Sequence, residues 1–251
     1  MKKSFRIIKF KKNKPALQVK SVSKSFEGRP VLKKINLDLF PGEIVGLVGT
    51  NGSGKSTLYG SIIGQYKVDS GSIFLNQKDI TSKPIHERAK LGIAFLSQHR
   101  SVFNMTVFDN LLGVCQISIK ENDKQRFMVE KLLTEFNLQH LRNINANSLS
   151  GGEVRRLQIA RTLINNPRVI LLDEPMAALD PIVVQDIQKF ILKLQSYGCG
   201  IIITDHQVQN LFEIVDRAYV IGEQTIIASG KPKEILKSNK ARELYFGSFE
   251  N

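Results

Sequence analysis

A glycine-rich loop between a short apolar strand and a helix constrains the fold of this chain more than any other feature. Residues 43–48 follow the Pro41-Gly42 break and form an apolar run that predicts a strand, and residues 56–63 carry apolar side chains at helical spacing. Between them, residues 49–57 read GTNGSGKST and fit the pattern G-x-x-x-x-G-K-[ST]. Strand, loop and helix in this order predict an α/β fold with a phosphate-binding loop at the carboxyl end of a strand.

The residue types of this phosphate loop, residues 49–57, suit a nucleotide. Its glycines let the backbone turn so that consecutive N–H groups point at phosphate oxygens, and the helix start adds a partial positive charge. We assign Lys55 to the β- and γ-phosphates and Ser56 to a Mg²⁺ ion. The residues expected to contact the nucleotide are Gly49, Asn51, Gly52, Ser53, Gly54, Lys55, Ser56 and Thr57.

A second apolar strand ends in two acids. Residues 169–174 read VILLDE, and such a run is typical of a strand buried on both faces of a parallel sheet. Asp173 suits a Mg²⁺ ion that holds nucleotide phosphates, directly or through water. We expect Glu174 to point to the other side of the strand's pleat and to orient or deprotonate a water molecule. The alternative is that both acids are solvated turn residues before Pro175.

Two further predicted strands end in polar residues. Residues 93–97 are followed by Gln98, and residues 200–204 are followed by Asp205 and His206. If all these strands are parallel, Gln98, His206, the two acids and the phosphate loop meet at one edge of the sheet, where ligands of open α/β sheets bind. Each residue alone also fits a surface amide or a turn histidine. Their shared edge favours a site for phosphoryl transfer.

The signature segment, residues 149–153, reads LSGGE. Ser150 and Glu153 form a capping-box pattern, which predicts the start of a helix. The apolar side of that helix holds Leu157, Ala160, Leu163 and Ile164. Gly151 and Gly152 leave its first turn bare enough for a phosphate to approach.

From about Leu17 onward, the chain resembles the ATP-binding subunits of ABC transporters. Six motifs carry the resemblance: Walker A at 49–57, the Q-loop at Gln98, the signature at 149–153, Walker B at 169–174, the D-loop at 178–180 and the switch His206. The resemblance implies a RecA-like parallel-sheet core with a small antiparallel β subdomain and an α-helical subdomain at about residues 99–160. It divides the chain into a basic tail (1–15), an ATP-binding domain (16–247) and a short end (248–251).

The resemblance also implies the ligands and the partners. ATP and Mg²⁺ are the expected cofactors, with Ser56, Gln98 and Asp173 at the metal and Glu174, His206 and Gln98 in catalysis. In such families Ser150, Gly151, Gly152 and Asp180 face the nucleotide of a second copy, so an ATP-bound homodimer is expected. Phe26 stands where the family places an aromatic residue against adenine. The alternative is a phenylalanine packed in the small antiparallel sheet.

Composition and charge restrict the setting. Because no apolar run approaches the roughly 18 residues needed to cross a bilayer, two separate permease subunits would form the transport path, with this chain on the cytoplasmic face of the inner membrane. Cys115 and Cys199 are expected to be buried and reduced. Seven of the thirteen net positive charges fall within the first fourteen residues, so we expect a solvated tail or a contact with anionic lipid rather than nucleic-acid binding.

Several stretches indicate the type of transporter. Residues 84–89, 110–112, 179–182, 203–208 and 245–249 resemble the lipopolysaccharide-export ATPases of Gram-negative bacteria. Branched-chain amino-acid importers have closely similar ATPases and are the nearest alternative. ATPases that act on DNA or ribosomes are an alternative of another class, but the segment between Lys55 and Ser150 has no sustained heptads. His99 and Val154 depart from the family pattern, and His99 lies where partner contacts are expected.

Overall fold

The computed structural model describes residues 14–99 and 101–238, which form two sheets and the helices around them. In the larger sheet the strand order is β10-β9-β3-β8-β7-β6, and every neighbouring pair is parallel except β9 and β10. The bounds are β3 Ile44–Val48, β6 Ile93–Leu96, β7 Val169–Asp173, β8 Gly200–Thr204, β9 Arg217–Gly222 and β10 Thr225–Gly230. The four parallel strands predicted from the sequence are therefore neighbours in one sheet.

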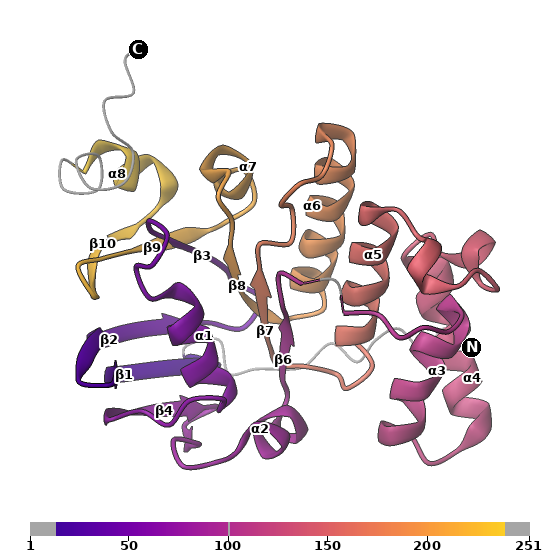
Figure 1. Ribbon diagram of the computed structural model, residues 1–251, viewed down its shortest axis with the longest axis horizontal. Helices are drawn as coiled ribbons and strands as arrows, with labels where there is room; N and C mark the ends of the chain where they lie inside the picture. The colour runs from indigo at the N-terminus through magenta and orange to yellow at the C-terminus, as the bar shows by residue number, and fades with distance from the viewer. Residues whose placement is uncertain (1–13, 100, 239–251) are drawn as a thin grey trace.

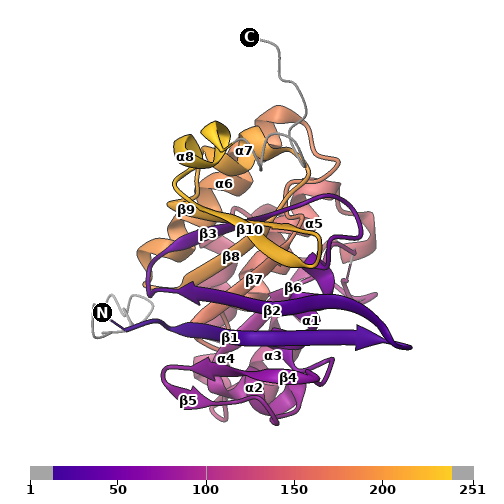
Figure 2. The same cartoon turned by 90° about the vertical axis from the view of Figure 1, so that its left-hand side faces the viewer.

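The smaller sheet is antiparallel and has the order β2-β1-β4-β5. Figure 2 shows it in front of the larger sheet, at one end of the molecule. Its strands are β1 Leu17–Phe26, β2 Arg29–Leu39, β4 Ser70–Leu75 and β5 Lys78–Asp79. Together with the parallel sheet, it confirms the predicted α/β P-loop fold with a small antiparallel part.

Helices cover the parallel sheet, and three of them lie in the chain between β6 and β7. These are α3 Val107–Ser118, α4 Asn122–Glu135 and α5 Gly151–Thr162, with short 3₁₀ turns at Gln139–Leu141 and Ala146–Ser148. In Figure 1, α3 and α4 lie at the end of the molecule opposite β1 and β2. The other helices are α1 Lys55–Ile63, α2 Ile85–Leu91, α6 Pro181–Ser196, α7 Val208–Phe212 and α8 Pro232–Lys237.

The core has two parts, separated by the parallel sheet. Ile44 and Val48 of β3 pack into the part that holds residues of α3, α5 and α6, whereas Val45 and Leu47 pack into the part that holds α1, β1 and β2. This alternation explains why the strand is apolar throughout: successive side chains point to opposite faces, and both faces are covered. Cys115 and Cys199 are buried, as predicted.

Individual side chains of α3 and α4 show how the first helix is capped and how the second packs. Thr106 caps α3, since its Oγ1 accepts a hydrogen bond of 3.0 Å from the Asp109 N–H. On α4, Leu132 and Leu133 are buried, whereas Phe127 is 57% exposed. Five residues advance a helix by about 140°, so Phe127 and Leu132 cannot share one face.

Some predictions lie partly or wholly outside the described residues. Residues 1–13 of the basic tail and residues 239–251 are outside, and so are the expected end at 248–251 and the stretch 245–249. Among the residues that the structure describes, every helix is too short or too polar to span a lipid bilayer.

Candidate active site

The phosphate loop connects β3 to α1 through close backbone contacts. A Cβ atom on Gly49 would lie 2.4 Å from the Ile221 carbonyl oxygen, so no larger residue fits there. Gly54 precedes α1 with φ = 106°, and Gly52 has φ = 78°, which are left-handed conformations that favour glycine. Asn51, Gly52 and Ser56 are exposed.

Lys55 is the first residue of α1 and turns back over the loop. Its Nζ donates hydrogen bonds of 2.7 Å to the Gly49 carbonyl and 2.9 Å to the Thr50 carbonyl. Burial lowers the pKa of Lys55, and the nearby carboxylates of Glu174 and Asp173 oppose that shift. The ammonium group is therefore bonded to the loop and lies near the carboxylates of Asp173 and Glu174.

The loop also contains a buried hydroxyl. Within residues 14–99 and 101–238, the Ser53 Oγ has no hydrogen-bond partner. Because a buried hydroxyl without a partner is costly, an anion in the loop that accepts its hydrogen would remove that cost. The loop thus fits a phosphate both by its backbone and by this side chain.

Glu174 lies between Gln98 and His206. Its Oε2 accepts a hydrogen bond of 2.6 Å from Gln98 Nε2, and its Oε1 lies 2.6 Å from His206 Nε2. Glu174 is buried, whereas the side chain of His206 is 48% exposed. Burial raises the pKa of Glu174, and His206 opposes that shift. The residues at the ends of β6, β7 and β8 therefore meet at one carboxylate.

Glu174 reaches this position through a turn after β7, and not as part of the strand as we predicted. We expected Glu174 to continue the pleat of β7, but the strand ends at Asp173 and Glu174 has φ = 49°. Its N–H donates to the Thr204 carbonyl at 3.0 Å and approaches the Thr204 Oγ1 at 3.1 Å. A turn, not strand alternation, thus separates the two carboxylates.

Asp173 is held by the neighbouring strand. It is the cross-strand partner of Thr204, whose Oγ1 donates a hydrogen bond of 2.7 Å to Asp173 Oδ1. Below it, the hydroxyl of the buried Tyr59 lies 3.3 Å from the Leu172 carbonyl oxygen. The Thr204 contact thus holds the Asp173 carboxylate at the edge of the sheet, and the Tyr59 contact joins the preceding residue of β7 to α1.

The signature segment starts α5 as its sequence predicts. Glu153 Oε2 accepts hydrogen bonds of 2.8 Å from both the backbone N–H and the hydroxyl of Ser150, completing the capping box. Ser150 and Gly151 are exposed. Gly152 is buried, and a Cβ atom on it would lie 2.5 Å from Val183 of α6, so this glycine permits close packing of α5 against α6.

Two buried side chains of α5 were missed from the sequence. Arg155 donates to the backbone carbonyls of Ser97, Gln98 and Glu174 at 3.1, 3.4 and 3.2 Å. Gln158 donates to the His99 carbonyl at 3.1 Å. Their spacing could have indicated this, because residues three apart in a helix share one face. In α5 that face is largely buried.

The predicted adenine site has a second aromatic ring. Phe26 is 39% exposed at the end of β1, and its ring meets that of Tyr66 edge to face, with centroids 5.2 Å apart. Lys24 Nζ lies 5.1 Å from the centroid of Phe26 and pairs with Asp69 at 3.0 Å. Phe26 thus belongs to the small antiparallel sheet, as the alternative expected, and part of its ring is open to solvent. A stacking role for Phe26 stays a prediction.

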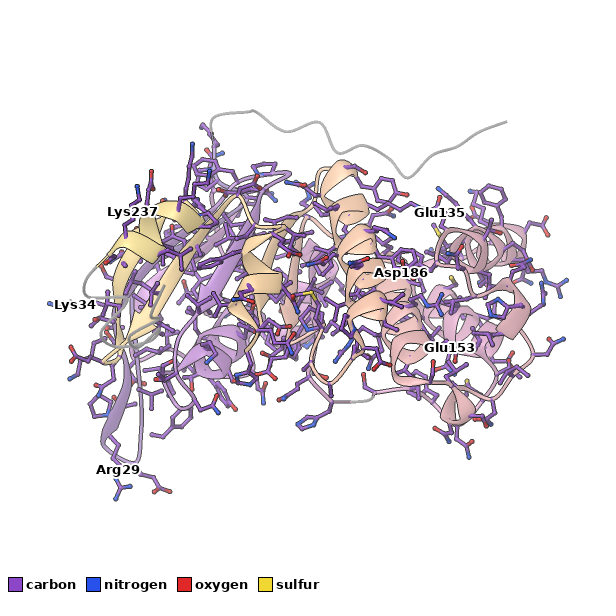
Figure 3. The ribbon with its side chains drawn as sticks, turned by 90° about the horizontal axis from the view of Figure 1, so that it is seen from above. Arg29, Lys34, Glu135, Glu153, Asp186 and Lys237 are labelled. Carbon is purple, nitrogen blue, oxygen red and sulfur yellow. The ribbon has the colours of Figure 1, made fainter. Side chains whose placement is uncertain are left out.

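Asp180 and Ser150 lie away from the phosphate loop in sequence and at the starts of other helices. Asp180 is exposed and occupies the N-cap position of α6, without a capping hydrogen bond from its side chain. In Figure 3, Glu153 of the capping box lies towards the end of the molecule marked by Glu135, opposite Arg29 and Lys34. Their contacts with the nucleotide of a second copy stay a prediction.

A groove lies away from the phosphate loop, between α2, β6 and the helices that lie in the chain between β6 and β7. Its volume is about 340 Å³, and Ile85, Phe95, Val114 and Arg161 are among its lining residues. Ile85 and Phe95 are 50% and 37% exposed. Arg161 donates to the Ser101 carbonyl at 2.7 Å, which joins the groove wall to the segment after Gln98.

Comparison with known proteins agrees with this fold. The family described as ABC transporter matches residues 32–177. The lipopolysaccharide export system ATP-binding protein LptB of Escherichia coli (strain K12) is 42% identical over 233 residues, which cover 92% of this chain and 97% of that protein. LptB of Haemophilus influenzae (strain Rd) is 40% identical, with the same coverage of both chains.

Two solved structures extend the comparison. The ADP conformation of MJ1267, an ATP-binding cassette of an ABC transporter, has a TM-score of 0.83 and 32% identity, covering 93% of this chain and 99% of that one. A dimeric post-hydrolysis state of the cassette MJ0796 with ADP and Pi has a TM-score of 0.76 and 26% identity, covering 86% and 98%. Fold and site thus define a P-loop ATP-binding cassette. The chain belongs to the ABC transporter family and is an ATPase of that family.

Proposed function

We propose that this chain is the ATP-hydrolysing subunit of a lipopolysaccharide exporter. The observation that supports this substrate is the 42% identity to a lipopolysaccharide-export ATP-binding protein over nearly the full length of both chains. The chain would act on the cytoplasmic face of the inner membrane, with two separate transmembrane subunits forming the path. Importers of the branched-chain amino-acid type remain the alternative within the same family.

In this proposal the phosphate loop and Phe26 hold ATP. The backbone N–H groups of residues 49–57, the hydroxyl of Ser53 and the ammonium group of Lys55 would receive the phosphates. Lys55 would exchange its bonds to the loop carbonyls for phosphate oxygens. Phe26, supported edge-on by Tyr66, would stack on adenine.

The residues at this edge also fit a nucleotide-bound Mg²⁺. Ser56, Gln98 and Asp173 offer the oxygen donors that Mg²⁺ prefers, and Gln98 uses its amide nitrogen on Glu174, so the remaining terminal atom is its oxygen. Within the described part of the chain, no group of three or more His, Cys, Asp or Glu side chains forms a metal site. In the proposed site, one carboxylate, Asp173, would hold the ion together with phosphates and water. Such an ion would neutralise charge on the phosphates.

Hydrolysis in this proposal depends on Glu174. Its carboxylate would orient and deprotonate the attacking water, while His206 and Gln98 hold its two oxygens. Loss of a positioned base typically costs about 10²–10⁴-fold in rate. Glu174→Gln should therefore nearly abolish turnover in a phosphate-release assay and retain ATP binding. Glu223→Gln, at an exposed turn, is the matched control. Turnover of Glu174→Gln at the control rate would contradict this role.

The groove beside β6 supports the proposed partnership. Its apolar walls and its link through Arg161 to the segment after Gln98 suit a short helix of a membrane subunit, near the position predicted from the sequence. The test is affinity purification of the tagged chain from detergent-solubilised native membranes, with mass spectrometry of the bound proteins. Two related multi-span proteins with large periplasmic domains would support lipopolysaccharide export. Recovery of importer permeases with a solute-binding protein would instead indicate a subunit of an importer. Recovery of the chain with ribosomes or DNA alone would overturn its assignment to a transporter.

A further inference from the structure

We propose that Thr204 is a positioning residue for ATP hydrolysis, whose side chain and backbone hold Asp173 and Glu174 in diverging directions. The inference rests on the proposed role of Glu174 and adds a residue that none of the six family motifs contains. Thr204 ends β8, lies directly opposite Asp173 of β7 and is fully buried.

The first contact acts on Asp173. The Thr204 hydroxyl donates its hydrogen to Asp173 Oδ1 at 2.7 Å, which fixes one oxygen of that carboxylate towards β8. Because the carboxylate is half-buried, a donor inside the protein replaces a water molecule that would otherwise compete for this oxygen. The hydroxyl thus determines which way Asp173 faces at the edge of the sheet.

The second contact acts on Glu174. Its N–H donates to the Thr204 carbonyl at 3.0 Å and lies 3.1 Å from the Thr204 Oγ1, so both oxygens of one residue accept from the same group. Glu174 has φ = 49°, a conformation that residues other than glycine rarely adopt and that persists only where neighbours hold it. This turn directs the Glu174 side chain to Gln98 and His206 instead of along the strand.

Together, these two contacts make the positions of the Asp173 and Glu174 carboxylates depend on one residue, Thr204. The Thr204 hydroxyl is a donor to Asp173 and an acceptor for Glu174. Its loss would release the Asp173 carboxylate and leave the Glu174 N–H held by the Thr204 carbonyl alone, which loosens the turn that directs Glu174. A residue that positions catalytic groups without touching ATP should affect kcat more than it affects the affinity for ATP. A displacement of about 1 Å in a reacting group can cost about 100-fold in rate.

The experiment compares Thr204→Val with Thr204→Ser in the full chain. Valine keeps the shape and removes the hydroxyl, whereas serine keeps the hydroxyl and removes a methyl group. We expect Thr204→Val to lower kcat by about 10- to 100-fold, with KM for ATP and the affinity for a fluorescent ATP analogue within about threefold of the wild type. Thr204→Ser should recover most of kcat.

Ile203→Val, in the same strand, controls for a loss of stability that removes no hydrogen bond. It should keep the wild-type kcat even if its melting temperature falls as far as that of Thr204→Val. Equal kcat in Thr204→Val and wild type, or equal losses in Thr204→Val and Ile203→Val, would overturn the inference. Glu174→Gln is measured in parallel: if it is inactive while Thr204→Val is fully active, only the positioning role fails. If Glu174→Gln itself turns over normally, the proposed chemistry fails instead.

Discussion

At the scale of single residues, the edge contact between Tyr66 and Phe26 connects the interior of α1 with the predicted adenine site. A Cβ atom at Gly60 would lie 2.4 Å from two carbons of the Tyr66 ring, so the ring can occupy its place only because residue 60 is glycine. Tyr66 in turn contacts the ring of Phe26. The position of the predicted stacking surface therefore depends on a glycine six residues before Tyr66.

Gly60→Ala should displace Tyr66 and weaken ATP binding. An aromatic pair contributes about 0.5–1.5 kcal/mol beyond area burial, so we expect KM for ATP to rise about two- to tenfold with a smaller change in kcat. Gly113→Ala is the matched control, because a Cβ atom there meets open space in another helix. It should leave KM unchanged and stabilise α3 by about 0.5–1 kcal/mol. Steady-state kinetics of both variants decide the point, and an unchanged KM in Gly60→Ala would contradict it.

At the scale of elements, the start of α3 depends on one side chain. Thr106 Oγ1 accepts from the Asp109 N–H, and the Thr106 hydroxyl also lies 2.5 Å from Asp109 Oδ2. Removing such a cap typically costs about 1 kcal/mol. Thr106→Ala should therefore lower the free energy of unfolding by about that amount in urea titrations, and Thr106→Ser should not. Since the hydroxyl of Thr106 bonds to Asp109 of the same helix and not to the residues that meet at Glu174, both variants should keep the wild-type kcat.

Elements formed by local pattern were predictable, whereas side chains held by distant segments were not. The apolar runs and flanking breaks gave β3, β7 and β8 to within a residue, and the capping box of Ser150 and Glu153 formed as expected. The left-handed turn at Glu174 was missed because it depends on Thr204, thirty residues away in sequence. Arg155 was missed for the same reason: its partners are carbonyls of two other segments.

At the scale of the whole molecule, one chain carries two separate halves of the proposed site. Residues of the phosphate loop and of the ends of β6, β7 and β8 meet at one edge of the parallel sheet. The exposed start of α5, with Ser150 and Gly151, belongs to the helical insertion instead. Figure 1 shows α1 and α5 on different sides of β6 and β7. A two-fold dimer would bring each half to the complementary half of its partner.

This arrangement predicts that two inactive variants should restore activity when mixed. Lys55→Ala removes the ammonium group of the phosphate loop, and Ser150→Arg places a bulky cation at the start of α5, so each homodimer has two defective sites. In an equal mixture about half of the dimers are mixed, and one of their two sites combines an intact loop with an intact signature segment. Up to about one quarter of the wild-type rate should therefore return in a phosphate-release assay. The two variants assayed separately are the controls. If the mixture is no more active than their average, each chain completes its own site and the head-to-tail dimer is wrong.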